Sequence, residues 1–395
     1  MSRKFSERAE AYLLSVIEDR REGWQADLLR VLLRVLSWVF TAVVRLRLWL
    51  YRMRILRDRT LGCQVISVGN LTVGGTGKTP VVEAFARSLH LSGRKVAILS
   101  RGYKKAKTRR RKSRRGTAAR GKRPAQPEKD EMRVVSDGSG PPLMSSYLAG
   151  DEPYMLASNL PGVAVIVGKN RVESGRYAVR KLKCDTLILD DGFQHLHLKH
   201  RLDIVLVDRT NPFGNEATLP RGVLREPVEN IKRAGFIILT KCNGDGSADL
   251  KNRLREHNPT AEFCECRHAA RHVVEVSDPT RKKLPLSILK GMKIIAMSGI
   301  AAPQGFIDEL RRQGAEVVDQ VRFSDHHRYS PDEIEEVVER GLAAGAQAVL
   351  TTEKDAVRMP EDRRWRLPIH YLRVEIEMLS GAEDFRKWIS KICYE

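Results

Sequence analysis

The residues best suited to chemistry form a short glycine-rich segment, Gly74-Gly75-Thr76-Gly77-Lys78-Thr79. In such a loop, glycines let backbone amides close around phosphate oxygens, a lysine reaches the β- and γ-phosphates, and a threonine hydroxyl can bind Mg²⁺. The usual motif, G-x-x-x-x-G-K-[ST], has its first glycine where this chain carries Thr72. The segment still predicts a nucleotide-binding loop, with Mg²⁺ as the accompanying ion.

Two carboxylates, Asp190 and Asp191, follow the apolar run Leu187-Ile188-Leu189. Ligands of open α/β sheets bind at the carboxyl ends of strands, so either carboxylate could hold the metal; a solvated pair at a strand end is the alternative. A later segment, Thr240-Lys241-Cys242-Asn243, has asparagine where a guanine-reading N/T-K-x-D motif ends in aspartate. We therefore expect ATP as the nucleotide.

The segments that must position these residues alternate between short apolar strands and helices. We expect strands at 64–70, 94–100, 162–168, 185–191, 203–208 and 235–241, with a helix at 79–93. A second series has strands at 293–299, 316–323 and 346–352 and helices near 303–314 and 331–344. This alternation predicts an α/β fold: a P-loop NTPase-like parallel sheet with helices on both faces, and a second, smaller α/β subdomain.

Three domains are expected from these patterns. They are a membrane-associated helical region at 1–60, a P-loop core at 61–290, and a C-terminal α/β subdomain at 291–395. The core is interrupted at 104–131 by a basic stretch without apolar periodicity, which predicts a disordered insertion.

Residues 28–51 read LLRVLLRVLSWVFTAVVRLRLWLY, an apolar helical segment interrupted by arginines. At 100° per residue, Arg30, Arg34, Arg45 and Arg52 fall within a stripe about 60° wide. The uninterrupted apolar run is shorter than the roughly 20 residues that span a bilayer. The pattern favours a helix on the membrane surface, or a tilted helix with snorkelling arginines, over a buried core helix.

The chain carries a formal net charge of +21, of which residues 104–123 supply twelve basic side chains and no acid. Such a run fits an anionic partner, either acidic phospholipid or nucleic acid. No aromatic residues for base stacking lie within it, which disfavours nucleic acid. No obligate protein partner is evident. A P-loop ATPase that acts as a switch or in partitioning is the rival class of protein.

The six scattered cysteines form no C-x-x-C pair, so a reducing, cytoplasmic setting is expected.

Seven segments together resemble one family, and they follow in order from about residue 60 to 360. They are VGNLTVGGTGKTP (68–80), SRGY (100–103), GDEP (150–153), GKNR (168–171), LDDGFQH (189–195), LPRGVLREP (219–227) and SDHHRYS (324–330). The combination is similar to the tetraacyldisaccharide 4′-kinase, or lipid A 4′-kinase, family. Thr72 in place of glycine is this family's own form of the loop. The basic insertion, and Arg221 where a small residue is usual, depart from the family's pattern.

The resemblance implies an activity and a location. It implies transfer of the ATP γ-phosphate to the 4′-hydroxyl of a tetraacylated disaccharide 1-phosphate, giving lipid IVA in lipid A biosynthesis. The reaction would take place at the cytoplasmic face of the inner membrane of a Gram-negative bacterium. The partners implied are this lipid substrate and the anionic membrane surface, and the family also carries an N-terminal membrane helix.

The resemblance also implies roles for single residues. Asp151 would be the catalytic base, paired across a cleft with His326, or with its neighbour His327. Lys78 and Arg171 would neutralise phosphate charge, and the metal would be held by Thr79, Glu152, Asp190 and Asp191. The residues implied to line the substrate site are Arg101, Tyr103, Asn170, Gln194, His195, Arg225 and Glu226.

Overall fold

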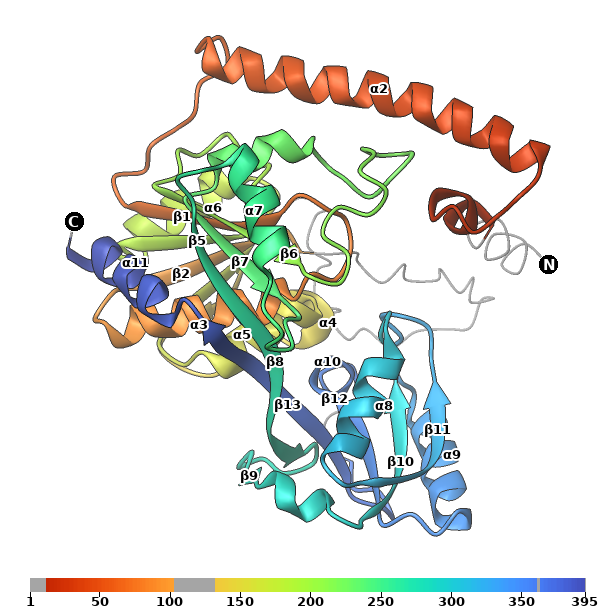
Figure 1. The fold of residues 1–395 in the computed structure, drawn as a ribbon. Helices are drawn as coiled ribbons and strands as arrows, with labels where there is room; N and C mark the ends of the chain where they lie inside the picture. Colours follow the sequence, from red (N-terminus) through yellow and green to blue (C-terminus); the bar gives the residue numbers. More distant parts are fainter. Residues whose placement is uncertain (1–11, 103–131, 361–362, 395) are drawn as a thin grey trace, which may run out of the picture. The chain divides into compact units, whose positions relative to one another are not determined.

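The structure, a computed structural model, describes residues 12–102, 132–360 and 363–394 (Figure 1). Tyr103 and the basic insertion at 104–131 lie outside these residues. The chain forms two compact units, one of residues 1–94, 185–269 and 375–395 and one of residues 95–184 and 270–374. Two strands, β8 (Glu262–Glu275) and β13 (Ile369–Ser380), run from one unit into the other. The domain boundaries expected near residues 60 and 290 stay predictions.

The first unit is built on a parallel sheet in the order β8-β7-β6-β1-β5. The other four strands are β1 (Gln64–Asn70), β5 (Thr186–Asp190), β6 (Leu202–Asp208) and β7 (Phe236–Thr240). The register places Val65 beside Leu187 and Ile66 beside Leu202. These strands are apolar along nearly their whole length, as expected of parallel strands whose two faces are both covered.

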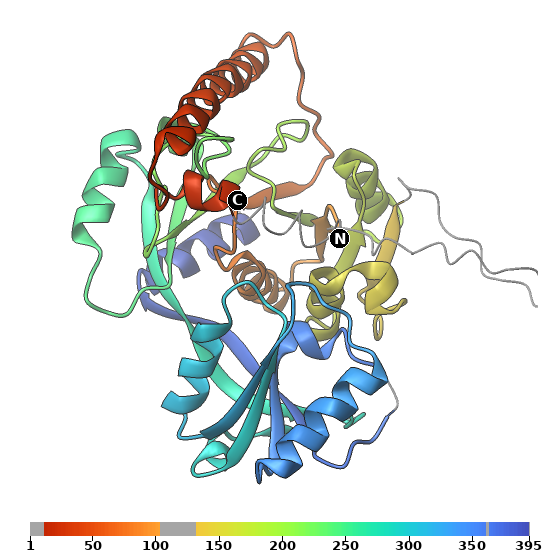
Figure 2. The ribbon, with the colours of Figure 1, turned by 90° about the vertical axis from the view of Figure 1, so that its right-hand side faces the viewer.

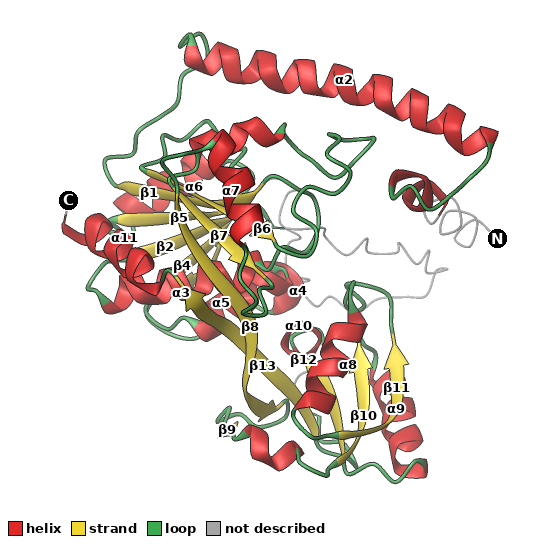
Figure 3. Ribbon diagram, viewed as in Figure 1, coloured by secondary structure: helices red, strands yellow, loops and turns green. Residues whose placement is uncertain are grey.

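Helices cover both faces of this sheet (Figure 3). They are α3 (Lys78–Leu91), α7 (Ala248–His257), α11 (Ala382–Tyr394) and the short η1 (Val228–Arg233). On one face, Val205 and Ile237 share a core with Leu254 of α7. On the other, the ring of Phe385 in α11 contacts Phe85 of α3, with ring centroids 5.3 Å apart. The two-sided α/β arrangement of this unit explains its continuous apolar strands.

A long helix, α2 (Trp24–Arg52), is attached to the first unit through its polar side. Ser37 Oγ lies 2.7 Å and Thr41 Oγ1 2.8 Å from Thr218 Oγ1, and Arg45 pairs with Glu229 at 2.7 Å. Large apolar side chains of the helix are instead exposed: Leu28, Val31, Leu32, Val35, Leu36, Trp38, Val39, Val43, Leu46 and Trp49. Within the part of the chain that the structure describes, no helix is both long and apolar enough to cross a membrane.

The second unit contains two groups of strands (Figure 2). In the first group, β4 (Ala164–Val167) lies between parallel β2 (Val96–Ser100) and antiparallel β3 (Arg133–Asp137), accompanied by α4 (Ser146–Ala149), α5 (Asp151–Asn159) and α6 (Arg171–Arg180). In the second, the order is β11-β10-β12-β13, all parallel, with β10 (Lys293–Ser298), β11 (Glu316–Arg322) and β12 (Ala348–Thr352). The shorter elements here are β9 (Lys283–Leu284), η2 (Leu286–Leu289) and α10 (Glu353–Ala356).

The second group of strands is also covered on both faces. Ile294 and Leu350 pack with Leu310 of α8 (Pro303–Arg312), whereas Ile295 and Val349 pack with the helix α9 (Pro331–Ala343). Successive residues of one strand thus belong to two different cores, as the period of two in a strand requires. The predicted α/β class with mostly parallel strands is confirmed.

Candidate active site

In the first unit, the glycine-rich loop joins β1 to α3, as its sequence predicts. Gly77 caps α3 with a φ of 78°, in the left-handed region that glycine adopts most readily. A Cβ placed on Gly77 would also lie 2.5 Å from Cε1 of the His268 ring. The backbone angle therefore favours glycine here, whereas the His268 side chain could move aside. The amides at the start of α3 form an anion-binding helix terminus.

The structure explains why Thr72 can replace the first glycine of the motif. Val73 N donates to Val223 O and Arg225 N donates to Leu71 O, each at 2.7 Å. Thr72 and Leu224 form an antiparallel bridge between these two hydrogen bonds. The loop therefore enters in an extended conformation that any residue adopts, and glycine becomes necessary only further along.

Lys78 is held in place by polar groups from two strand ends. Its Nζ donates to Asn70 Oδ1 at 3.0 Å and lies 3.3 Å from Asp191 Oδ1. Arg225 Nη1 donates to both carboxylate oxygens of Asp191 at 2.8 Å. Burial raises the pKa of Asp191, but the charges of Lys78 and Arg225 outweigh burial and hold that pKa below its ordinary value. The site thus keeps an ionised carboxylate beside the lysine.

Three further residues implied to be substrate-binding lie in this unit. Gln194 Nε2 donates to Asn70 O at 3.1 Å, so Gln194 belongs to the group around Lys78. His195 follows in the same turn, where its N–H donates to Gly192 O at 2.7 Å. Glu226 is buried, and its Oε2 accepts hydrogen bonds from Asn230 and Arg233. These contacts of Glu226 fix the loop that carries Arg225.

The donor set of this unit suits Mg²⁺. Thr79 stands in the first turn of α3, Asp190 ends β5, and Asp191 follows directly. Mg²⁺ is commonly bound through one or two carboxylates together with substrate phosphates and water. Within the described residues, no cluster of three or more histidine, cysteine or acidic side chains forms a metal site of protein ligands alone. A threonine at the start of α3 and a carboxylate pair at the end of β5 are consistent with an ion that arrives with the nucleotide.

In the second unit, the structure brings Asp151 and His326 together although they are 175 positions apart in the chain. Asp151 Oδ2 lies 3.2 Å from His326 Nδ1 and accepts from Arg358 Nε at 2.8 Å, and Oδ1 accepts from Arg328 Nη2 at 3.1 Å. The carboxylate stands in the first turn of α5, where the positive end of the helix dipole favours its charge. The side chain of Asp151 is 12% exposed and that of His326 is 42% exposed.

These partners determine the ionisation of Asp151. Burial raises the pKa of the carboxyl, but the hydrogen bond with His326 and the charges of Arg358 and Arg328 lower the pKa further than burial raises it. The net result is a pKa below the ordinary value. Asp151 is therefore a carboxylate at neutral pH, and its Oδ2 orients the His326 ring.

Arg358 links this pair to the interior of the unit. Its Nη1 donates to Gly299 O at 2.9 Å and to Asp355 Oδ1 at 3.1 Å, and its Nη2 lies 3.2 Å from His326 Nδ1. Asp355 also accepts from Tyr329 Oη at 2.9 Å. The Arg358 side chain is 1% exposed and that of Asp355 is fully buried. Arg358 therefore acts as a positioning residue for Asp151 and His326.

The rival histidine, His327, is engaged elsewhere. Its Nε2 lies 3.0 Å from Glu333 Oε1, and its ring stacks on Phe323 with centroids 4.8 Å apart. Glu333 in turn forms the capping box of α9 with Ser330. Of the two histidines, His326 is thus the one in contact with Asp151.

The remaining predicted residues of the second unit are found at ends of its elements. Arg101 and Arg171 follow β2 and β4, whose last residues are paired in parallel register. Asn170 caps α6 by accepting from the N–H groups of Val172 and Glu173, and Arg171 is buried in the first turn. Glu152 pairs with Lys354 at 2.7 Å. Tyr103 lies outside the described residues.

Two arginines of this site were not predicted. Arg328 belongs to the SDHHRYS segment, two positions after His326, and its nearness to the histidine was the available signal. Arg358 stands just after the helical turn that follows β12, where an arginine is usually solvent-exposed. Nothing in the local sequence distinguishes it, because its partners come from three distant segments.

A glycine-rich phosphate loop on a parallel α/β sheet, with Lys78 held among strand-end side chains, defines a P-loop nucleotide-binding protein. The carboxylate–imidazole pair adds groups that can receive a proton, as expected in a phosphotransferase. Residues 29–394 match the model of the family described as tetraacyldisaccharide-1-P 4′-kinase. The chain belongs to this family.

Relatives and a solved structure agree with this assignment. The chain is 34% identical to a tetraacyldisaccharide 4′-kinase from Halothermothrix orenii, over 97% of both chains. It is 41% identical to one from Anaeromyxobacter dehalogenans, over 87% of this chain and 85% of the relative. The crystal structure of LpxK from Aquifex aeolicus in complex with ATP superposes with a TM-score of 0.70 at 29% identity, covering 93% of this chain and all of that chain.

Proposed function

We propose that this protein is an ATP-dependent kinase that phosphorylates the 4′-hydroxyl of a tetraacyldisaccharide 1-phosphate, giving lipid IVA in lipid A biosynthesis. The observation that carries the proposal is the phosphate loop with Lys78 between Asn70 and Asp191, in a chain that matches the family model over nearly its whole length. The ATP complex of the Aquifex aeolicus relative supports ATP as the donor.

We assign the nucleotide to the first unit. The loop residues Gly74 to Gly77 present backbone amides, and the ammonium of Lys78 meets the β- and γ-phosphates. On binding, Lys78 would exchange its contacts with Asn70 and Asp191 for phosphate oxygens. Asp191 would keep its ion pair with Arg225 and could also contact the metal. The loop is thus already arranged for a polyanion before nucleotide arrives.

Thr79, Asp190 and Asp191 of the first unit would hold Mg²⁺, and Glu152 remains a metal ligand only as the family resemblance implies it. When bound, the ion supplies neutralisation of charge on the phosphates. The ion pair between Glu152 and Lys354, at 2.7 Å, orients this carboxylate without a metal. Arg171 would meet the phosphate being transferred or the phosphate already on the lipid.

The Asp151–His326 pair is proposed to take the proton of the attacking hydroxyl. His326 is the more exposed partner, and its Nδ1 is turned toward Asp151, which leaves Nε2 on the other side of the ring. Asp151 orients the ring, and its negative charge stabilises the imidazolium that forms. Arg101, Asn170, Gln194, His195, Arg225 and Glu226, with Tyr103, are the residues that we assign to the sugar site or its support.

We further propose that α2 holds the enzyme on the inner face of the bacterial inner membrane. At 100° per residue, its exposed apolar side chains from Leu28 to Trp49 fall on an arc about 160° wide, opposite Ser37 and Thr41, which contact the protein. A helix with its apolar face outward and its polar face on the enzyme fits a membrane surface. The basic insertion at 104–123 would strengthen attraction to anionic lipid.

The direct test is a phosphorylation assay. Purified protein is incubated with γ-³²P-ATP, Mg²⁺ and tetraacyldisaccharide 1-phosphate in detergent, and the lipid is analysed for a second phosphate at position 4′. Label on the 4′-oxygen that depends on Lys78 supports the proposal. ATP hydrolysis at an unchanged rate with and without lipid, and no labelled lipid, would instead indicate a switch ATPase.

A further inference from the structure

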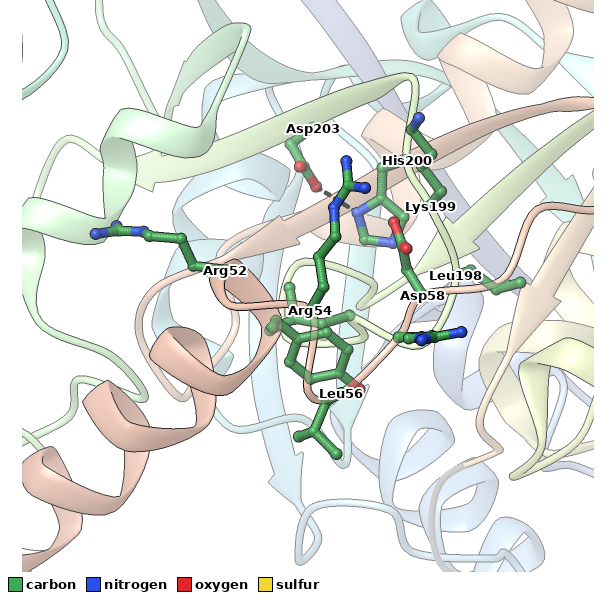
Figure 4. Close-up of a pocket in the computed structure, with 11 residues that line it drawn as sticks. Arg52, Arg54, Leu56, Asp58, Leu198, Lys199, His200 and Asp203 are labelled. Atoms are coloured by element: carbon green, nitrogen blue, oxygen red, sulfur yellow. Dashed lines mark hydrogen bonds and ion pairs between the residues drawn. The ribbon is translucent and has the colours of Figure 1, made fainter.

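The strongest feature outside the active site is a cationic pocket of about 740 Å³ in the first unit. Its walls come from the last turn of α2, the segment that follows it, and the segment before β6 (Figure 4). It is lined by Tyr51, Arg52, Arg54, Leu56, Arg57, Asp58, Leu196, Leu198, Lys199, His200 and Asp203. This pocket is separate from the phosphate loop, because it adjoins the amino ends of β1 and β6 whereas the loop follows the carboxyl end of β1. Seven residues of parallel strand span roughly 23 Å.

The charges of this pocket are unbalanced. Four cations, Arg52, Arg54, Arg57 and Lys199, line it against the two carboxylates of Asp58 and Asp203, and none of the four has a carboxylate within ion-pair distance among the described residues. By contrast, elsewhere in the same unit, Arg94 pairs with Asp185 and Arg221 with Asp19. An opening lined by four cations without partners attracts an anion and offers it several donors.

A buried imidazole in the wall supplies an independent observation. His200 Nδ1 lies 2.8 Å from Asp203 Oδ1, so Asp203 is already engaged, and the His200 side chain is only 5% exposed (Figure 4). Its other nitrogen, Nε2, is buried and has no hydrogen-bond partner among the described residues. A buried polar atom without a partner is uncommon in folded proteins, and this one belongs to a residue in the wall of the pocket.

The frame of the pocket is fixed by backbone contacts. Arg59 N donates to His197 O at 2.8 Å, and Lys199 N donates to Arg59 O at 3.0 Å. Tyr51 Oη lies 3.1 Å from His197 Nδ1, which joins the last turn of α2 to the same segment. The cationic side chains are therefore carried by a backbone that is already ordered. Less backbone conformational entropy is lost when a ligand binds them.

We propose that this pocket binds the phosphate group of an anionic phospholipid. The ligand class follows from charge and surroundings: phosphate oxygens suit the guanidinium and ammonium donors of the pocket, and the exposed side chains of Met53, Ile55 and Leu56 are close to these donors in the chain. These exposed apolar residues directly follow α2 in the chain, so the acyl chains of a lipid whose headgroup is in the pocket would have apolar side chains beside them. The inference rests on the proposed membrane location of α2 and adds a specific lipid site at its end.

The test measures the acetylation rate of Lys199 by mass spectrometry in the full-length protein. Vesicles of phosphatidylglycerol, vesicles of phosphatidylcholine and dissolved inorganic phosphate are compared, with exposed Lys283 in each sample as the internal control. We expect phosphatidylglycerol to slow acetylation of Lys199 about tenfold and to leave Lys283 unchanged. In Arg54→Ala/Arg57→Ala the protection should fall to less than about threefold, since each basic residue near an anionic surface contributes substantially to binding.

Matched controls separate this site from general attraction to the membrane. Arg34→Ala/Arg311→Ala removes the same charge outside the pocket and should keep the protection. Equal protection of Lys199 in both double variants would overturn the proposal, as would protection by inorganic phosphate with none by vesicles, which would indicate a soluble ligand. Phosphorylation of detergent-dispersed substrate should be unchanged in all these variants, so failure of the pocket and failure of the proposed kinase activity give different results.

Discussion

Replacing Arg358 by methionine should destabilise the second unit. It should also move the acidic limb of the enzyme's pH–rate profile to higher pH. The side chain is almost completely buried and donates to Asp151, Asp355 and Gly299. Methionine has a side chain of similar length but no charge, so Asp151 and Asp355 each lose one cationic partner. Removing one partner of a buried ion pair costs about 3–5 kcal/mol of unfolding free energy. For a unit of about 200 residues, this lowers the unfolding temperature by roughly 6–20 °C.

The pH effect follows from the lowered pKa of Asp151. A carboxyl with a depressed native pKa stabilises the fold above its unfolded pKa, and that contribution is lost as pH falls through the native pKa. Arg358→Met removes one of the charges that lower this pKa and leaves the burial that raises it. The pKa of Asp151 should therefore rise, and the acidic limb of kcat/KM should move to higher pH.

Calorimetry and a pH–rate profile with disaccharide substrate measure the two effects. Arg358→Lys keeps a charge but fewer donors and should lose less stability, and Arg311→Met, at an exposed arginine, should change neither quantity. Adding Asp355→Asn to Arg358→Met should recover part of the stability by removing the other buried charge. An Arg358→Met protein with the wild-type unfolding temperature and acidic limb would refute the positioning role.

Four shorter predictions concern the remaining parts of the machinery. Lys78→Ala should lower kcat at least 100-fold with the circular-dichroism spectrum unchanged, because it removes the charge that meets the transferred phosphate. Asp151→Ala and His326→Ala should each slow turnover, and their combined loss in a double-mutant cycle should be smaller than the sum; strictly additive losses would contradict a shared proton. Trp38→Glu should reduce sedimentation with vesicles and leave turnover in detergent unchanged, because it places a charge on the exposed face of α2. A Gly/Ser linker in place of 104–123 should raise KM on anionic vesicles, chiefly at low salt, as screening of juxtamembrane charges requires.

The parts of the fold that sequence predicts well are those with local causes. The strand predicted at 64–70 coincides with β1, and the one at 203–208 with all but the first residue of β6, because buried parallel strands need continuous apolar runs. β8 and β13 escape prediction because charged and polar residues are interspersed along them, as in ECRHAARH and RVEIEM. Their strand structure depends on neighbouring strands rather than on an apolar run.

The same distinction applies to the candidate site. The phosphate loop is a local motif, so its residues could be named from spacing alone. The Asp151–His326 contact joins residues far apart in the chain, and only the family resemblance suggested it. The local sequence does not mark Arg358 as a site residue, because its burial depends on a tertiary network involving Asp355, Gly299 and Tyr329. Sequence patterns thus identify reactive residue types, whereas the fold determines which of them meet.

The orientation of α2 is the main support for the proposed membrane contact. The arginine stripe was predicted as the polar side of an amphipathic helix, and the structure gives that side a second role, because Arg45 pairs with Glu229. Ten large apolar side chains remain between 45% and 66% exposed. Full burial of such a side chain contributes about 1.5–3 kcal/mol, so covering what remains exposed would gain on the order of 10 kcal/mol. A gain of this size supports the proposal that the apolar face of α2 contacts a membrane while its polar side is held on the enzyme.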